Sequence, residues 1–271
     1  MSTCAVDAAG VVHEPAAPDA RIVSLVPSIT ELLFALRLDS QIVGRTGFCV
    51  HPRDLVRRVP KVGGTKAVKV DAIRALHPTH LIANIDENEA ETVDILRAFV
   101  PHVVVTHPLT PQDNFALYRL LGTIFDRSAE AQRLSEALEL RLQETVQHAW
   151  PAEQVLYAIW RDPWMTVARN TYISAMLRLV NWQTLPAAHG GREGANRYPV
   201  FDLDAPWLAG VDRVLLSSEP YRFTEAHRAA LERDPRLAGK RVELIDGELV
   251  SWYGVRAIEG VAYLARLASA G

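Results

Sequence analysis

The sequence lacks several features that would assign it to a class at once. Only two of its 271 residues are cysteines, and Cys4 lies in a stretch that we expect to be unstructured, so a structural disulfide is not expected. No apolar run approaches the roughly 20 residues of a transmembrane helix. Residues 1–20 contain neither the basic start nor the apolar segment of a signal peptide. We therefore expect a cytoplasmic protein, or a periplasmic one if the natural start lies upstream.

Motifs of catalysis and nucleotide binding are also missing. The chain contains no G-x-S-x-G or H-E-x-x-H motif, and PKVGGTK at 60–66 does not follow the order of a phosphate-binding loop. No nucleophile, base and orienting residue form a recognisable set, which favours a binding protein over an enzyme. The net charge is −3, and no continuous basic block is present, so we expect no nucleic-acid partner.

The clearest positive pattern is a long amphipathic helix expected over 128–150. Ser128 can cap its start, and Pro151 prevents its continuation. Its apolar residues recur at steps of three and four, as one face of a helix requires: Ala131, Leu134, Leu138, Leu142, Val146 and Ala149. This helix divides the chain into a flexible tail (1–20), an N-terminal α/β lobe (21–127) and a C-terminal α/β lobe (151–271).

Strands and helices alternate on both sides of this helix, which predicts an α/β fold with parallel sheets. Within the first lobe, we expect Ser28 and Glu31 to form a capping box for a helix over 29–38. The segments 30–38 and 171–179 resemble each other, and so do 71–84 and 204–217. These matches favour two similar lobes, although any two βα units share some features. The predicted strands are 21–26, 41–44, 80–84, 102–105, 154–160, 213–217 and 241–245.

The ligand of such a protein is expected in the cleft between the lobes, at the carboxyl ends of the strands. The loops expected there are rich in aromatic residues: Phe48, Trp160, Trp164, Tyr221, Phe223, Trp252 and Tyr253. Aromatic rings on loops suit a large flat apolar ligand with polar edges. Alternatively, these rings seal the interface between the lobes.

One of these loops also holds Cys49 and His51, two positions apart. In an extended segment their side chains would point the same way and could approach one metal ion. A third ligand could come from the other half of the chain, with Glu219, His227, His189 and Asp246 as candidates. The alternative is a cysteine packed inside the loop beside a surface histidine.

Several stretches resemble the helical-backbone periplasmic binding proteins, which are the substrate-binding components of ABC importers for cobalamin, haem and iron–siderophores. RIVSLVPSITELLFAL, VGGTKAVKVDAIRALHPTHLIAN and the long helix occur in the order typical of that family, and the resemblance covers 21–269. The loops FCVHP, SSEPYRF and DGELVSWYG look like those of the branch called helical-backbone metal receptors. The resemblance is greatest to the cobalamin-binding branch, and it implies a monomeric, non-enzymatic protein that carries a corrinoid, or else a haem or an iron–siderophore, to a permease dimer. A bound corrinoid or metal ion would be cargo and not a catalytic cofactor.

The resemblance also implies roles for single residues. Phe48 falls where cobalamin binders place a stacking Tyr, Tyr198 falls near a stacking Trp, and Thr65 replaces another Trp. The expected ligand-binding set is Phe48, Cys49, His51, Trp164, Tyr198, Glu219, Tyr221 and Trp252. Asp71 and Asp204 occupy the positions of carboxylates that dock onto arginines of the transporter, although each could instead stabilise a helix N-terminus. Two alternatives stay open, namely a direct metal-ion receptor using Cys49, His51 and His227, and a cytoplasmic protein that reuses the fold.

Overall fold

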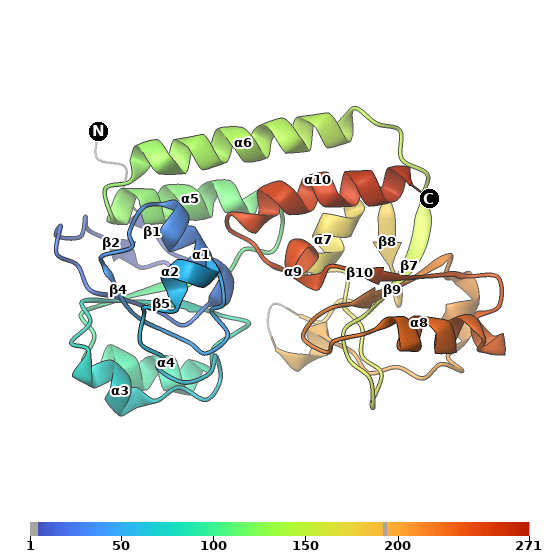
Figure 1. Cartoon of the computed structure of the whole chain (residues 1–271), viewed down its shortest axis with the longest axis horizontal. Coiled ribbons are helices and arrows are strands. Elements are labelled where there is room, and N and C mark those ends of the chain that lie inside the picture. Colours follow the sequence, from blue (N-terminus) through green and yellow to red (C-terminus); the bar gives the residue numbers. More distant parts are fainter. Residues whose placement is uncertain (1–4, 192–193, 271) are drawn as a thin grey trace. The chain divides into compact units, whose positions relative to one another are not determined.

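The computed structural model describes residues 5–191 and 194–270, and Figure 1 shows the order of the elements along the chain. The contacts between residues separate the chain into two compact units. Unit 1 comprises Met1–Pro108, Gln112–Ala137 and Tyr253–Val255, and unit 2 comprises Leu109–Pro111, Leu138–Trp252 and Arg256–Gly271.

Unit 1 is built on a four-stranded parallel sheet in the order β4-β3-β5-β6. The strands are β3 (Ile22–Ser24), β4 (Ile42–Arg45), β5 (His80–Asn84) and β6 (His102–Thr106). The helices are α1 (Pro27–Ala35), α2 (Arg53–Val56), α3 (Val70–Ala75), α4 (Ala90–Arg97) and α5 (Asp113–Ile124). All five residues of β5 are buried, as expected for a central strand of a parallel sheet that is covered on both faces.

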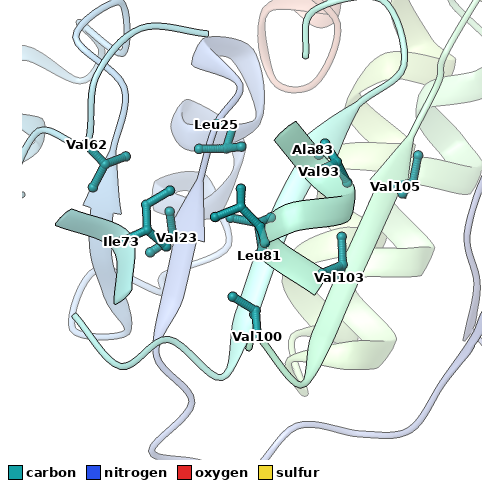
Figure 2. Close-up of a cluster of buried hydrophobic side chains, with 11 residues drawn as sticks. Val23, Leu25, Val62, Ile73, Leu81, Ala83, Val93, Val100, Val103 and Val105 are labelled. Carbon is teal, nitrogen blue, oxygen red and sulfur yellow. The ribbon is translucent and has the colours of Figure 1, made fainter. Parts of the chain in front are cut away.

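Alternate residues of these strands form the core on one face of the sheet (Figure 2). Leu81 and Ala83 of β5 lie in the same buried cluster as Val103 and Val105 of β6, because residues two apart on a strand point to one face. Helices α3 and α4 cover this face with the buried side chains Ile73, Val93 and Leu96.

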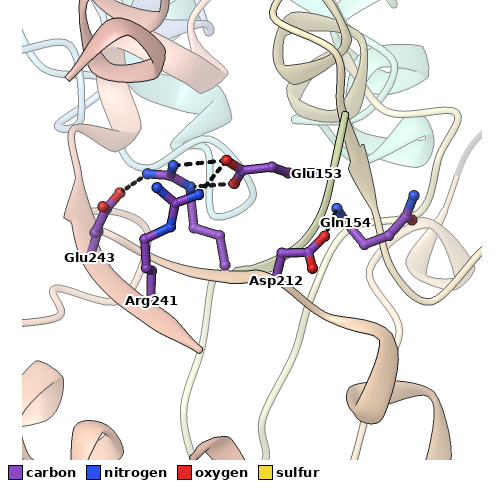
Figure 3. Close-up of polar contacts among 6 residues, drawn as sticks. Glu153, Gln154, Asp212, Arg241 and Glu243 are labelled. Carbon is purple, nitrogen blue, oxygen red and sulfur yellow. Dashed lines mark hydrogen bonds and ion pairs between the residues drawn. The ribbon is translucent and has the colours of Figure 1, made fainter. Parts of the chain in front are cut away.

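Unit 2 contains a second four-stranded parallel sheet, in the order β10-β9-β7-β8. Its strands are β7 (Glu153–Ala158), β8 (Trp182–Thr184), β9 (Arg213–Ser217) and β10 (Arg241–Ile245). Its helices are α7 (Tyr172–Arg178), α8 (Glu225–Glu232), α9 (Gly247–Ser251) and α10 (Arg256–Ser269), with short 3₁₀ segments η1 (Ala195–Arg197), η2 (Pro206–Gly210) and η3 (Pro235–Leu237). At the amino ends of the strands, Arg213 is 1% exposed and bonds both Glu153 and Glu243 (Figure 3).

The two sheets have the same strand order. In this comparison β7, β8, β9 and β10 of unit 2 correspond to β3, β4, β5 and β6 of unit 1. Helix α1 follows β3 in unit 1, and α7 follows the corresponding strand β7 in unit 2. The predicted α/β fold with two similar units and parallel sheets is therefore confirmed.

Helix α6 (Ser128–Val146) is shorter at its C-terminus than predicted. The unit boundary falls within it, between Ala137 and Leu138. Leu138 is fully buried, whereas Val146 is 72% exposed, so the predicted apolar face does not extend to the last turn. There the indole Nε1 of Trp150 donates to the carbonyl of Thr145 at 2.8 Å, which satisfies one of the carbonyls that a helix end leaves open. In the described part of the chain, no helix has both the length and the apolar composition needed to cross a membrane.

The expectation of a flexible tail over 1–20 is wrong for its described residues. Strands β1 (Ala5–Val6) and β2 (Val12–His13) form an antiparallel hairpin. The carboxylate of Asp7 is buried and accepts hydrogen bonds from His13 Nε2 at 3.0 Å and from the backbone N–H of Val105 at 2.9 Å. The contact with Val105 of β6 spans 98 positions, which local sequence patterns cannot reveal. Cys4 lies outside the described residues.

Local starts and stops of helices account for the other differences. Helix α1 begins at Pro27, with Val26 as its N-cap and no side-chain capping hydrogen bond, so the capping box of Ser28 and Glu31 is wrong. Pro27 takes the first position, where a missing N–H costs nothing. The sequence patterns also missed the short elements α2, β8 and α9, which have too few residues to show a periodicity.

Candidate functional site

The loop after β4 in unit 1 presents Phe48 at the surface. The side chain of Phe48 is 63% exposed. Its ring lies over Gly64, because a Cβ added to that glycine would come within 3.4 Å of a ring carbon. The neighbouring Gly63 has a φ of +109°, a conformation that favours glycine, and its carbonyl accepts the N–H of Gly47 at 2.7 Å. The backbone that carries the ring is therefore anchored to a second chain segment.

The side chain of Arg45, the last residue of β4, stabilises the conformation of this loop. It is 5% exposed. Its Nη1 donates to the carbonyls of Thr46 and Cys49, both at 3.1 Å, and its Nε donates to the carbonyl of Val59 at 3.2 Å. Charged donors make stronger hydrogen bonds than neutral ones. One buried guanidinium thus ties the Phe48 loop to the segment that follows α2.

Cys49 is part of this support and does not face solvent. Its side chain is fully buried, and its Sγ lies 3.0 Å from Thr30 Oγ1 and 3.2 Å from Thr46 Oγ1. Burial raises the pKa of the Cys49 thiol above its ordinary value, despite these hydrogen bonds. The thiol is therefore protonated at neutral pH and is a poor metal ligand. His51, two residues on, is half-buried.

The predicted metal site of Cys49, His51 and His227 finds no support. Over residues 5–191 and 194–270, no three His, Cys, Asp or Glu side chains form a group that could hold a metal ion. His227 instead completes a capping box at the start of α8, where its Nδ1 accepts the N–H of Thr224 at 3.0 Å. Its Nε2 lies 3.2 Å from the hydroxyl of Tyr221, so both ring nitrogens have partners. Asp246, another candidate ligand, caps α9.

Aromatic rings gather in unit 2 on the loops that follow β7 and β9. Trp160 is 40% exposed, and its ring meets that of Tyr221 edge-on with centroids 5.6 Å apart. Trp164 stacks on Phe223, with centroids 5.8 Å apart and planes 7° from parallel. Trp164 and Tyr221 are half-buried. The structure thus brings together two of the predicted ligand-binding residues on one surface of unit 2.

Trp164 also lines a cavity of about 540 Å³ within unit 2. This volume lies in the range of small-molecule sites, roughly 300–1,000 Å³. Its walls combine aromatic and aliphatic residues with charged ones: Asp162, Pro163, Trp164, Val200, Phe201, Asp202, Leu203 and Arg236. Tyr198, another predicted site residue, is half-buried just before Val200.

Trp252 and Glu219 contact each other inside unit 2. Trp252 is 9% exposed, and its Nε1 donates to Glu219 Oε1 at 2.7 Å. The guanidinium of Arg256 lies 5.2 Å from the Trp252 ring centroid. Burial raises the pKa of Glu219 above its ordinary value, more than the hydrogen bonds from Ser251 and Trp252 lower it. A direct contact of Trp252 or Glu219 with a ligand stays a prediction.

The two predicted docking carboxylates are both exposed. Asp71 lies in the first turn of α3, where it also favours the positive end of the helix dipole. Asp204 precedes η2, and its Oδ2 lies 3.3 Å from Arg236 Nη1 while its side chain is 74% exposed.

Sequence reasoning did not identify Arg45 or the pairing of Glu219 with Trp252. A charged residue that ends a short apolar strand could have indicated the first, whereas the second joins positions 33 apart and has no local signature.

Comparison with known proteins identifies the family. Residues 22–213 match the model of a family described as periplasmic binding protein. An uncharacterized ABC transporter substrate-binding lipoprotein, YvrC of Bacillus subtilis (strain 168), is 24% identical over 255 residues, which cover 90% of this chain and 78% of that protein.

Solved structures show the same fold. The periplasmic vitamin B12 binding protein BtuF of Vibrio cholerae is 18% identical with a TM-score of 0.74, covering 93% of this chain and 98% of that one. A periplasmic heme binding protein from Pseudomonas aeruginosa is 26% identical with a TM-score of 0.72, covering 91% of each chain.

These matches give no support to the expected cytoplasmic location, because the family is one of periplasmic proteins and the Bacillus relative is called a lipoprotein. They agree instead with the resemblance noted in the stretches 21–36 and 62–84. Since the family match spans 22–213, well over half of the 271 residues, the chain belongs to the periplasmic binding protein family.

Proposed function

We propose that the protein is the substrate-binding component of an ABC importer and that its substrate is a metal chelate with a flat apolar face, such as a corrinoid, a haem or an iron–siderophore. The observation that supports this most strongly is Phe48, whose ring is 63% exposed on a loop tied down by Arg45. An aromatic ring held in place beforehand offers a stacking surface without the cost of ordering it on binding.

Unit 2 supplies further surfaces of the same kind. Trp160 and Tyr221 present ring edges and faces on one surface, and Trp164 lines the 540 Å³ cavity. In this proposal Trp164, Tyr198 and Tyr221 contact the chelate. Relatives of this fold include proteins named for vitamin B12 and for heme, both of which are flat metal macrocycles.

Within the Phe48 loop, His51 is the residue that we propose as an axial ligand of the chelated metal. Neutral imidazole is a common ligand of iron and cobalt centres. Cys49 instead acts by packing, because its thiol is fully buried and has a raised pKa caused by that burial.

The proposed partner of the protein is a permease dimer. Asp71 and Asp204, one on each unit, would pair with basic residues of a permease dimer, since both carboxylates are exposed and opposite charges guide association. The protein would act as a monomer without catalysis, outside the cytoplasmic membrane.

Titration of the purified chain with cobalamin and with haem, followed by visible absorption, tests the proposal. We expect binding with a Kd in the micromolar range or below, and about tenfold weaker binding for Phe48→Ala, equivalent to about 1.4 kcal/mol. The unfolding temperature should not change, because the ring is mostly exposed. Leu140→Ala, which removes a side chain that is 52% exposed on α6, is the matched control and should bind normally. Absence of binding to any corrinoid, haem or iron–siderophore would contradict the proposal.

A further inference from the structure

The segment around Phe48 is strongly basic in a chain that is acidic overall. Residues 45–69 contain seven Lys and Arg residues and one acidic residue, Asp54, whereas the whole chain has 29 basic and 32 acidic residues. Arg45 is buried. The other six, which we call the basic loop, are all exposed: Arg53, Arg57, Arg58, Lys61, Lys66 and Lys69. This charge is therefore concentrated at one surface of unit 1.

The basic loop has almost no compensation from nearby acids. In the part of the chain that the structure describes, Lys66 is its one member within 4 Å of a carboxylate, that of Glu89 at 3.7 Å. Both of these side chains are more than half exposed, and such a pair contributes little. Several helical arginines elsewhere are paired with acids, as Arg228 is with Glu225 and Glu232. The loop is thus available to an anionic partner.

Backbone contacts place part of the basic loop beside the segment that carries Phe48. Arg45 and Lys61 lie opposite each other in a parallel bridge, and the N–H of Val62 donates to the carbonyl of Arg45 at 2.8 Å. Lys61 and Lys66 therefore flank the Gly63–Gly64 pair on which the ring lies. Arg53 begins α2, five positions after Phe48. An exposed aromatic ring and exposed cations therefore occur on chain segments that contact each other in unit 1.

This combination selects for the charge of a ligand as well as its shape. A flat chelate that lies on Phe48 would bring its edge toward the cations. Guanidinium and ammonium groups bind carboxylates through charge-assisted hydrogen bonds, and arginine can do so with two parallel bonds. A chelate edged by neutral amides would accept single hydrogen bonds and leave the cations without counter-charge.

We infer that the chelate bound by this protein carries peripheral carboxylates, and that the basic loop of unit 1 recognises them. This inference rests on the proposed function and specifies its substrate class as an anionic chelate. The residues that would determine this preference are Arg53, Arg57, Arg58 and Lys61, because none of them has a carboxylate within 4 Å among the described residues.

Matched pairs of chelates test the inference in the full-length chain. One pair is cobyrinic acid, a corrinoid edged by free carboxylates, and its heptamethyl ester, in which those carboxylates are neutral. The other is haem and its dimethyl ester, which share one ring system. We expect the acid form of each pair to bind at least about tenfold more tightly at 0.1 M salt. The advantage should shrink at 1 M salt, where the screening length falls from about 10 Å to about 3 Å.

Substitution then assigns the preference to residues. The variant with Arg53, Arg57, Arg58 and Lys61 all changed to Gln should lose most of the preference for the acid form, with little change for the neutral form. The control removes the same charge at four exposed arginines outside the loop, Arg37, Arg119, Arg233 and Arg266, and should keep the preference. Circular dichroism should show that both variants are folded.

The possible outcomes distinguish the inference about the basic loop from the proposed function. Equal affinity for acid and neutral forms would overturn the inference and leave the proposed function intact. Loss of the preference in the control variant as well would overturn the role of the basic loop, because net charge alone would then explain it. Binding of the chain to vesicles of phosphatidylglycerol, lost in the four-site variant while both chelate forms bind equally, would assign the loop to a lipid surface instead. Failure of all four chelates to bind would overturn both the inference and the proposed function.

Discussion

Glu219 accepts a hydrogen bond from the indole nitrogen of Trp252 at 2.7 Å, through the oxygen that also accepts the hydroxyl of Ser251 at 2.5 Å. This carboxylate joins the loop after β9 to the end of α9. Burial is the main reason that its pKa lies above the ordinary value of 4.5, and the nearby charges of Glu248 and Asp246 add to the effect. The folded state therefore holds the Glu219 proton more firmly than the unfolded chain does.

A raised pKa for an acid destabilises the folded state as the pH increases. Below pH 4.5, Glu219 is protonated in both states, and above that value the unfolded chain loses its proton first. The contribution of Glu219 to the free energy of unfolding should therefore fall as the pH rises from 4.5 through the pKa of Glu219 in the folded state. We expect Glu219→Gln, which keeps an acceptor oxygen and removes the charge, to be more stable than the original protein at pH 7 and less dependent on pH.

Urea unfolding between pH 4 and 8 measures this effect. Trp252→Phe keeps an aromatic ring but removes the N–H donor. It should lower the free energy of unfolding by about 1 kcal/mol and leave the Glu219 carboxylate with one hydrogen bond fewer. A Glu219→Gln variant that is less stable than the original protein at every pH would show that the charge is needed.

The ion network of Arg213 predicts a large and specific loss of stability. Its Nε and Nη2 donate to Glu153 at 2.8 and 3.1 Å, and its Nη1 donates to Glu243 at 2.5 Å (Figure 3). Its guanidinium lies 4.4 Å from the Trp182 ring centroid. Arg213→Ala leaves two carboxylates without this partner and should cost about 3–5 kcal/mol in urea unfolding. Arg241→Ala is the control, because that side chain is 41% exposed and should contribute about 1 kcal/mol or less.

The same network predicts sensitivity to acid. Burial alone would raise the pKa of Glu153, but the hydrogen bonds and charges of Arg213 and Arg241 outweigh burial and lower it. A lowered pKa gives stability that is present above the ordinary value of 4.5 and is lost as the pH falls through the folded pKa. Unfolding free energies measured from pH 6 to pH 3 should fall less steeply in Arg213→Ala than in the original protein.

The buried carboxylate of Asp7 predicts that the first residues stabilise unit 1. Asp7→Ala removes the acceptor for the N–H of Val105 and for His13, and an unpaired buried N–H costs about 1–3 kcal/mol. We expect a loss of stability in that range, together with faster hydrogen exchange at Val105 and faster proteolysis before residue 20. Glu14→Ala, a change of an exposed acid in the same segment, should have no effect. Equal proteolysis of all three proteins would contradict the docking of the hairpin.

The buried thiol of Cys49 predicts slow alkylation. In a Cys4→Ser background, iodoacetamide should modify Cys49 far more slowly in the native protein than in urea, because the side chain is fully buried and burial raises its pKa. Dialysed protein should contain no zinc, nickel or iron that disappears on Cys49→Ala. A stably bound ion that does depend on Cys49 would restore the direct metal-binding alternative.

Much of the fold follows from sequence patterns that are local. Strand β5 was predicted over the residues that form it, because Leu81, Ile82 and Ala83 form a short apolar run at the centre of HLIAN. The site followed less well. The exposure of Phe48 depends on the close approach of Gly63 to Gly47, and the burial of Cys49 depends on Thr30 and Arg45. Such contacts join distant positions, so the spacing within one loop could not reveal that Cys49 is buried.

Residues Tyr253–Val255 belong to unit 1, although the chain on both sides of them belongs to unit 2. The N–H of Gly254 donates to Asn114 Oδ1 at 2.6 Å, its carbonyl accepts the hydroxyl of Tyr118 at 2.8 Å, and Tyr253 donates to Glu87 at 2.5 Å. Unit 1 is therefore not complete until almost the whole polypeptide has been synthesised. During translation, unit 1 must wait for a segment near the C-terminus. A fragment that stops at Ala137 would lack these three hydrogen bonds. Such a fragment would therefore not reproduce unit 1 as it exists in the intact protein.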